Sequence, residues 1–299
     1  MRTTLDIRAV FALVVLCGSW GLAQVATKVA LWGIPPALQM GGRSAIAAVL
    51  VFVWCLVRRK PVFQSDGTLW PGLLVGFLFA GEFLLLFYGL QLTTASRGVV
   101  FLYLAPFVVA VAAHFVLGER LSTVKLVGLV AAFLGVVLAF SGALPSSTGG
   151  SIAGDALCVG AAIAWGLTIV LIKGSALAKV SAEKTLLYQL AISAVVGIGL
   201  SLALGEEVDW GLALAVLPAF LYQAIWVAAF TYVAWFALIR AYQVSLLSAF
   251  TFLTPLFGVA FGVALLNEPV SASLLAALAL VAVGIYLVNR STTPAAGAA

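Results

Sequence analysis

Long apolar runs separated by short polar breaks cover most of this 299-residue chain. Each run approaches or exceeds the roughly 20 residues that a helix needs to cross a bilayer. No alternation typical of barrel strands is visible, and a lipid-exposed backbone must satisfy its hydrogen bonds internally, so each run is predicted to be a helix. The ten runs are 9–31, 36–57, 70–92, 98–117, 124–143, 152–173, 185–204, 211–238, 246–266 and 272–288.

The composition agrees with a chain that lies almost entirely in lipid. Hydrophobic residues make up 64% of the sequence and charged residues 8%, whereas a soluble domain carries about 25% charged residues. Ten spans of about 20 residues consume about 200 positions. The rest suffices for short loops and leaves no room for an extramembrane domain, so we expect one integral membrane domain.

The positions of the charges predict the orientation. With the N-terminus in the cytoplasm, all but three of the 15 Lys and Arg residues lie on the cytoplasmic side. The exceptions are Lys28, Arg43 and Arg97, and an acidic loop with Glu206, Glu207 and Asp209 falls on the outer side. The positive-inside rule therefore places both termini in the cytoplasm and the chain in a bacterial-type inner (plasma) membrane.

Two sequence patterns occur twice. The pattern W-G-L-x5-K begins at Trp20 and again at Trp165, at an offset of 145 residues. Further along, a proline followed after twelve residues by a glutamate links Pro106 to Glu119, and the same pattern links Pro255 to Glu268 at an offset of 149. These matches occur in the same order along the chain, which indicates an internal repeat.

The repeat divides the ten spans into two halves of five, residues 1–145 and 146–299. Because five is odd, the second half must run through the membrane in the opposite direction to the first. Inverted-topology repeats are typical of secondary transporters. The predicted fold is therefore an all-α membrane protein with ten transmembrane helices in two inverted five-helix repeats.

The Trp-Gly pair in the first span of each half and the Pro-x12-Glu pattern in the fourth resemble the EamA family of the drug/metabolite transporter superfamily. The sequence Tyr103-Leu104-Ala105-Pro106 makes it similar, within that superfamily, to the YddG-type amino acid exporters. The resemblance covers essentially the whole chain. It implies ten spans, cytoplasmic termini, a central cavity and export of amino acids.

Glu82 is the most informative candidate for substrate binding, since it lies near the middle of span 3. An ionised group at that depth costs about 2.5 kcal/mol or more, so the side chain is expected to face a polar interior. It would then anchor a substrate ammonium group or take part in proton coupling. The alternative is a protonated carboxyl that holds a neighbouring helix.

The other candidates surround that depth. Trp20 and Trp165 lie mid-span at equivalent positions, and aromatic faces suit an ammonium group or an apolar side chain. Tyr103, Gln24 and Thr168 add polar groups, although helix packing would explain each of these residues as well. Pro106 and Pro255 each remove an intrahelical hydrogen bond and are predicted to be hinges.

Two charged or titratable residues are assigned structural roles instead. Arg43, early in span 2, could attract a carboxylate but is predicted to snorkel to the outer surface. His114 is the only histidine, and without neighbouring carboxylates or thiols it predicts no metal site.

The sequence therefore predicts a secondary transporter that exports amino acids or related metabolites by alternating access, with a small-molecule substrate and the bilayer as its partners. No cofactor or nucleic acid is expected, and no GxxxxGK[ST] pattern for ATP occurs. An exporter of other metabolites or of lipophilic cationic drugs is the alternative. A membrane-embedded enzyme is disfavoured because one histidine and one mid-span carboxylate provide too few catalytic groups.

Overall fold

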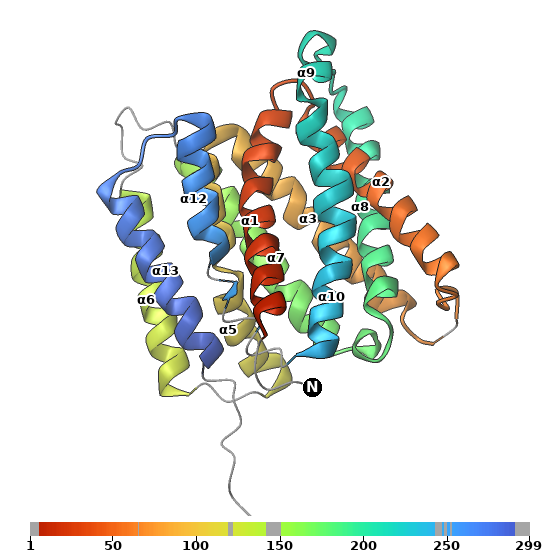
Figure 1. The fold of residues 1–299 in the computed structure, drawn as a ribbon, viewed down its shortest axis with the longest axis horizontal. Helices are drawn as coiled ribbons and strands as arrows, with labels where there is room; N and C mark the ends of the chain where they lie inside the picture. The colour runs from red at the N-terminus through yellow and green to blue at the C-terminus, as the bar shows by residue number, and fades with distance from the viewer. Residues whose placement is uncertain are drawn as a thin grey trace, which may run out of the picture.

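The computed structural model describes residues 6–64, 66–118, 122–141, 151–242, 247, 250–251 and 253–290. The regular structure of this part of the chain is helical (Figure 1). Glu119, the first glutamate of the repeated Pro-x12-Glu pattern, lies outside the described residues. The elements are α1 (Ile7–Ala30), α2 (Pro36–Val57), α3 (Leu69–Leu92), α4 (Ala95–Leu102), α5 (Ala105–Leu117), α6 (Thr123–Ser141), α7 (Ile152–Lys173), η1 (Ala176–Lys179), α8 (Ala182–Leu204), α9 (Trp210–Leu221), η2 (Tyr222–Thr231), α10 (Tyr232–Ala241), α12 (Leu253–Leu266) and α13 (Ala272–Arg290).

Seven helices among the described residues are long and apolar enough to cross a membrane, and three shorter apolar helices accompany them. The fourth of the seven combines α4 with α5, and the seventh runs from α9 into α10. Most helix ends lie within three residues of the predicted bounds, and α2 and α7 match them at both ends. The chain is an all-helical, multi-pass membrane protein.

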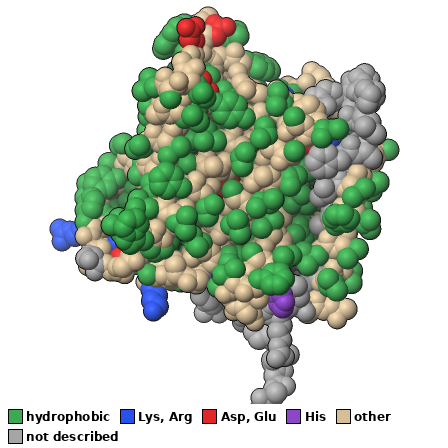
Figure 2. Space-filling view, turned by 180° about the vertical axis from the view of Figure 1, so that it is seen from behind, with side chains coloured by type: hydrophobic (Ala, Val, Ile, Leu, Met, Phe, Trp, Pro, Cys, Tyr) green, Lys and Arg blue, Asp and Glu red, His purple; other side chains and the backbone are tan. Residues whose placement is uncertain are grey.

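The two ends of the helix bundle differ in charge. In the space-filling view, acidic side chains gather at the top and basic ones near the bottom, with an apolar surface between them (Figure 2). We call the end with Glu206, Glu207 and Asp209 the acidic end, and the end with Arg58, Arg59 and Lys60 the basic end. Such a separation of charged ends by an apolar belt is what a bilayer requires.

The glycine of each Trp-Gly pair allows two helices to approach closely. A side chain on Gly21 of α1 would place its Cβ 2.7 Å from the backbone nitrogen of Gly258 in α12. A side chain on Gly166 of α7 would place its Cβ 2.6 Å from the Cβ of Val108 in α5. Both distances are too short for real atoms, so each glycine is required by its contact. The repeated motif is therefore a packing motif at its glycine.

One membrane segment is broken near its middle, and another contains a π-helix. Helix α4 ends at Leu102 and α5 begins at Ala105, so the break predicted at Pro106 is present and the proline occupies the first turn of α5. This position suits proline because the first turn needs no N–H donor. Pro255 likewise lies in the first turn of α12. A second irregularity, the π-helix η2, was not predicted, and it follows Pro218 in α9.

Candidate functional site

The centre of the bundle contains a carboxylate and a guanidinium. Glu82 on α3 and Arg43 on α2 are both buried, with 4% and 5% of their surface exposed, and the two charges interact electrostatically. The guanidinium carbon of Arg43 lies 3.9 Å from the ring centroid of Phe83. The prediction that Arg43 snorkels to the outer surface is therefore wrong, because the cation is held inside by an aromatic face and a carboxylate.

This central pair retains hydrogen-bonding capacity. Glu82 Oε2 and Arg43 Nε have no hydrogen-bond partner, although both atoms are buried. Buried polar atoms in folded proteins almost always have a partner, from the protein or from water. An acceptor and a donor of opposite charge are thus available at the same place in the membrane interior.

Tyr103 and Trp165 pack against each other in the interior of the bundle. Their rings meet edge to face with centroids 5.6 Å apart, and Tyr103 is 5% exposed. Tyr103 lies in the break between α4 and α5, where its hydroxyl is close to Thr254 at the start of α12 and interacts electrostatically with Tyr232. Tyr232 also interacts electrostatically with Arg43 and with Glu82. The structure therefore brings Tyr103 and Trp165 into contact with each other, and Tyr232 interacts electrostatically both with Tyr103 and with Glu82.

Trp20 reaches the same region through the π-helix. Its indole Nε1 donates a hydrogen bond of 3.0 Å to the Thr231 hydroxyl, which donates in turn to the Val227 carbonyl oxygen at 2.6 Å. Thr231 directly precedes Tyr232. Trp20 also meets Trp235 edge to face, with centroids 5.4 Å apart. The side chain is thus positioned by hydrogen bonding and by packing at the border of the cluster.

Further hydrogen bonds join α1 to the π-helix. Tyr222 donates to the Ser19 carbonyl oxygen and Trp226 Nε1 to the Ser19 hydroxyl, each at 2.9 Å. Thr27 donates to Gln223 Oε1 at 2.7 Å. A π-helix directs its side chains differently from an α-helix and is frequent at functional sites. In this chain four of its polar or aromatic side chains form hydrogen bonds with α1, namely Tyr222, Gln223, Trp226 and Thr231.

Gln24 and Thr168 are less closely connected to the centre. Both are buried, and neither Gln24 Oε1 nor Thr168 Oγ1 has a hydrogen-bond partner. No hydrogen bond described for either residue reaches Glu82, Tyr103 or Trp165. They are unsatisfied polar groups in the interior of the bundle.

A second polar network closes the acidic end of the bundle. Arg97 on α4 forms a buried salt bridge with Asp155 on α7, and its Nε lies 3.1 Å from each carboxylate oxygen. The Thr93 hydroxyl donates to Asp155 Oδ1 at 2.7 Å. Lys28 Nζ donates to the carbonyl oxygens of Thr93 and, at 2.8 Å, of Leu90 at the end of α3. These bonds tie α1, α3, α4 and α7 together.

Glu268 completes this network from the opposite half of the chain. Its carboxylate accepts bonds from Ala95 N at 2.6 Å, Ser96 N at 2.8 Å and the Ser96 hydroxyl at 2.6 Å. These donors lie at the N-terminus of α4, where a negative charge is stabilised by the helix dipole and the free N–H groups. The glutamate of the second Pro-x12-Glu pattern therefore caps a helix of the first half.

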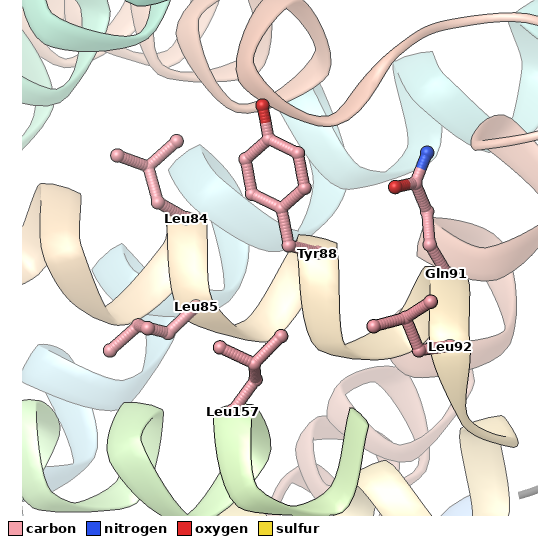
Figure 3. Close-up of a pocket in the computed structure, with 6 residues that line it drawn as sticks. All are labelled: Leu84, Leu85, Tyr88, Gln91, Leu92 and Leu157. Atoms are coloured by element: carbon pink, nitrogen blue, oxygen red, sulfur yellow. The ribbon is translucent and has the colours of Figure 1, made fainter. Parts of the chain in front are cut away.

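Two surface grooves in the described part of the chain lie away from the centre. One, of about 460 Å³, is lined by α3 side chains that include Tyr88 and Gln91 and by Leu157 of α7 (Figure 3). The other, of about 310 Å³, lies between α5, α6 and α7. Neither is lined by Glu82, Tyr103 or Trp165. The central cavity implied by the resemblance is not one of these two grooves.

The comparison with protein families identifies the chain. A family model described as "EamA-like transporter family" matches residues 7–141 and 152–290. The chain belongs to the EamA-like transporter family. Among curated relatives, it is 26% identical over 279 residues to the uncharacterized transporter YoaV of Bacillus subtilis, covering 90% of this chain and 92% of YoaV. It is 28% identical over 296 residues to the uncharacterized transporter YvbV of the same organism, covering 95% and 92%.

A solved crystal structure also has the same fold. It aligns with a TM-score of 0.62 at 21% identity and covers 93% of each chain. This similarity concerns the fold alone. Together with the family match, it assigns the bundle to a known class of membrane transporters. Within the described residues, no group of three or more His, Cys, Asp or Glu side chains is placed to hold a metal ion.

Sequence reasoning missed two residues of the centre, Thr231 and Tyr232. The offset of 149 residues that relates the two proline patterns also relates Glu82 to Thr231 and Phe83 to Tyr232. Applying that offset to Glu82 would have identified the segment that faces it. The repeat therefore carried the signal, although no local motif marks these positions.

Proposed function

We propose that this chain is a secondary transporter that exports amino acids or related small metabolites across the inner membrane by alternating access. Its binding site is centred on Glu82, with Tyr103, Trp165 and Trp20 around it and Gln24 and Thr168 as further polar groups. The observation that carries this proposal is the buried carboxylate of Glu82, which has an oxygen without a partner in a chain of a transporter family. Intramembrane carboxylates mark substrate or ion pathways.

The packing of the helices supports two inverted repeats of five spans, residues 1–145 and 146–299. Gly21 of α1 packs against Phe257 and Gly258 of α12, and Gly166 of α7 packs against Val108 of α5. Val108 and Phe257 are related by the same offset of 149 residues. Each contact thus joins the first helix of one half to the fourth span of the other half. Such equivalent contacts suit alternating access, because each half can adopt the arrangement of the other.

The charge distribution supports an orientation with both termini in the cytoplasm. The basic end then faces the cytoplasm and the acidic end faces outward, in agreement with the positive-inside rule. We propose Pro106 and Pro255 as the hinges. Each lies in the first turn of a helix, Pro106 in α5 and Pro255 in α12.

Lipophilic cations are a less suitable substrate class than amino acids. The guanidinium of Arg43 lies over the ring of Phe83, the residue after Glu82, and would repel a ligand with only a positive charge. A substrate with an additional carboxylate would be attracted by both residues. The central pair therefore favours a solute that carries both charges.

The test is counterflow in proteoliposomes that contain the purified protein and unlabelled L-leucine, L-threonine or L-phenylalanine. We expect uptake of the same labelled amino acid in the wild type and its loss in Glu82→Gln. Glu207→Gln serves as the matched control, because Glu207 is exposed at the acidic end. Wild-type uptake of none of the three amino acids would contradict the proposed substrate class. Equal uptake by wild type and Glu82→Gln would contradict the proposed site.

A further inference from the structure

In the described part of the chain, two buried arginines each interact with a buried carboxylate, and the two pairs differ in how completely they are bonded. Arg97 and Asp155 form a salt bridge with several hydrogen bonds, and Thr93 adds another to the carboxylate. Arg43 and Glu82 interact electrostatically but leave Arg43 Nε and Glu82 Oε2 without a partner. A buried pair stabilises a protein only when its geometry and hydrogen bonds are good. The first pair meets that requirement, and the second does not.

The environment of Arg43 explains why its Nε donor remains available. The guanidinium carbon lies 3.9 Å from the centroid of Phe83 and 5.7 Å from that of Phe87. An aromatic face attracts the cation without using its N–H groups. The planar guanidinium can therefore still bind a carboxylate through its edge, which is the geometry that arginine provides better than lysine.

We propose that Arg43 is a specificity-determining residue that binds the carboxylate of a zwitterionic substrate while Glu82 binds its ammonium group. This inference rests on the proposed transport function and specifies its substrate class as net-neutral zwitterions. When both side chains are ionised, they neutralise each other in the absence of substrate. When a zwitterion binds, its two charges are neutralised in turn, so the site has a net charge of zero in both states.

The neutrality of the site has a consequence for transport. A site with an uncompensated charge is costly to move through the membrane interior, whereas a neutral site can change its access with or without substrate. The carrier should therefore catalyse net flux as well as exchange, and the translocation of a zwitterion should not respond to the membrane potential.

The test measures how charged analogues inhibit counterflow of labelled L-leucine. Isoamylamine retains the ammonium group and side chain of leucine without its carboxylate, and 4-methylpentanoate retains the carboxylate without the ammonium group. We expect neither analogue to inhibit the wild type strongly. In Arg43→Gln, leucine affinity should fall by about 30-fold or more, because one buried charge–charge contact is lost, and isoamylamine should become an inhibitor. In Glu82→Gln, 4-methylpentanoate should become the inhibitor.

Arg58→Gln is the matched control. Arg58 lies at the end of the same helix and stacks on Trp54 with its guanidinium carbon 4.6 Å from the ring centroid, but it is exposed at the basic end. This variant should behave as the wild type does. Leucine counterflow that is unaffected by Arg43→Gln, or wild-type uptake that rises when a potassium gradient with valinomycin imposes a potential, would overturn the proposal. Absence of counterflow in the wild type would instead refute the amino acid function on which it rests.

If either single variant does not fold, the double variant Arg43→Gln with Glu82→Gln replaces it, since this variant leaves no uncompensated charge. It should fold, as judged by size-exclusion chromatography and thermal unfolding, and should lose leucine counterflow. A folded double variant that still transports leucine at the wild-type rate would show that the pair is structural and would overturn the proposal.

Discussion

The closure of the acidic end by Glu268 leads to a prediction of measurable size. Glu268→Gln keeps the shape of the side chain but removes the charge that accepts from two backbone N–H groups and one hydroxyl at the start of α4. A hydrogen bond to a charged group contributes about 1.5–3 kcal/mol. The amide oxygen can still accept one of these bonds, so closure should weaken by about 2–4 kcal/mol in total.

This change in free energy should appear as a change in the accessibility of Cys158. That residue is fully buried in α7, next to the network, where a side chain on Gly89 would place its Cβ 2.8 Å from the sulfur. If labelling requires opening of the acidic end, its rate is proportional to the opening equilibrium. A difference of about 2–4 kcal/mol corresponds to an increase of about 30- to 1,000-fold in that equilibrium.

The assay is labelling of detergent-solubilised protein by a water-soluble maleimide, with the modified cysteine identified by peptide mass spectrometry. Cys17 and Cys55 are also buried and serve as internal references, since their labelling should increase only if the whole protein unfolds. Glu207→Gln provides the control for a charge lost at the same end. A folded Glu268→Gln variant with wild-type labelling of Cys158 would refute the conclusion that this carboxylate holds the acidic end closed.

Three further predictions concern stability, each measured by thermal unfolding in detergent. Gly21→Ala should destabilise the protein by about 1–3 kcal/mol through overpacking. Gly18→Ala on the same helix should not, because nothing lies within 4 Å of its added Cβ. Equal loss of stability in the two variants would contradict the packing argument. Asp155→Asn should cost about 3–5 kcal/mol, because it leaves Arg97 buried without a counter-charge, and an unchanged melting temperature would contradict that role. The hydrogen bond from Lys184 lowers the pKa of Asp66 to about 2. The wild type should therefore be more stable than Asp66→Asn by the full amount above about pH 4, and this difference in stability should disappear towards pH 2. A difference in stability that persists at pH 2 would contradict this assignment.

The sequence predicted the membrane segments well because the length of an apolar run is a local property. The bounds predicted for α2 and α7 match the structure at both ends. The break near Pro106 could also be predicted, since the missing N–H of proline is a property of the residue itself. Local chemistry was thus sufficient for most of the fold.

The location of Arg43 could not be predicted in the same way. An amphipathic helix shows which face is buried through a stripe of apolar residues, but a membrane helix is apolar all round. Neither α2 nor its neighbours provide such a stripe, so the sequence did not show whether Arg43 faces lipid or the interior. The role of Glu268 was hidden for a related reason, because its partners at the start of α4 are about 170 residues away in the chain.

The two buried arginine–carboxylate pairs indicate how structure and specificity are separated in this bundle. At the acidic end, the carboxylates of Asp155 and Glu268 accept several hydrogen bonds each, and such saturated groups hold helices together. At the centre, Arg43 and Glu82 remain incompletely bonded, and such groups can exchange one partner for another. Variants at the acidic end should therefore change the opening equilibrium and stability with little effect on which solute is preferred. Variants at the centre should change the preferred solute. If both pairs were merely structural, variants at the centre would change stability and leave the preferred solute unchanged.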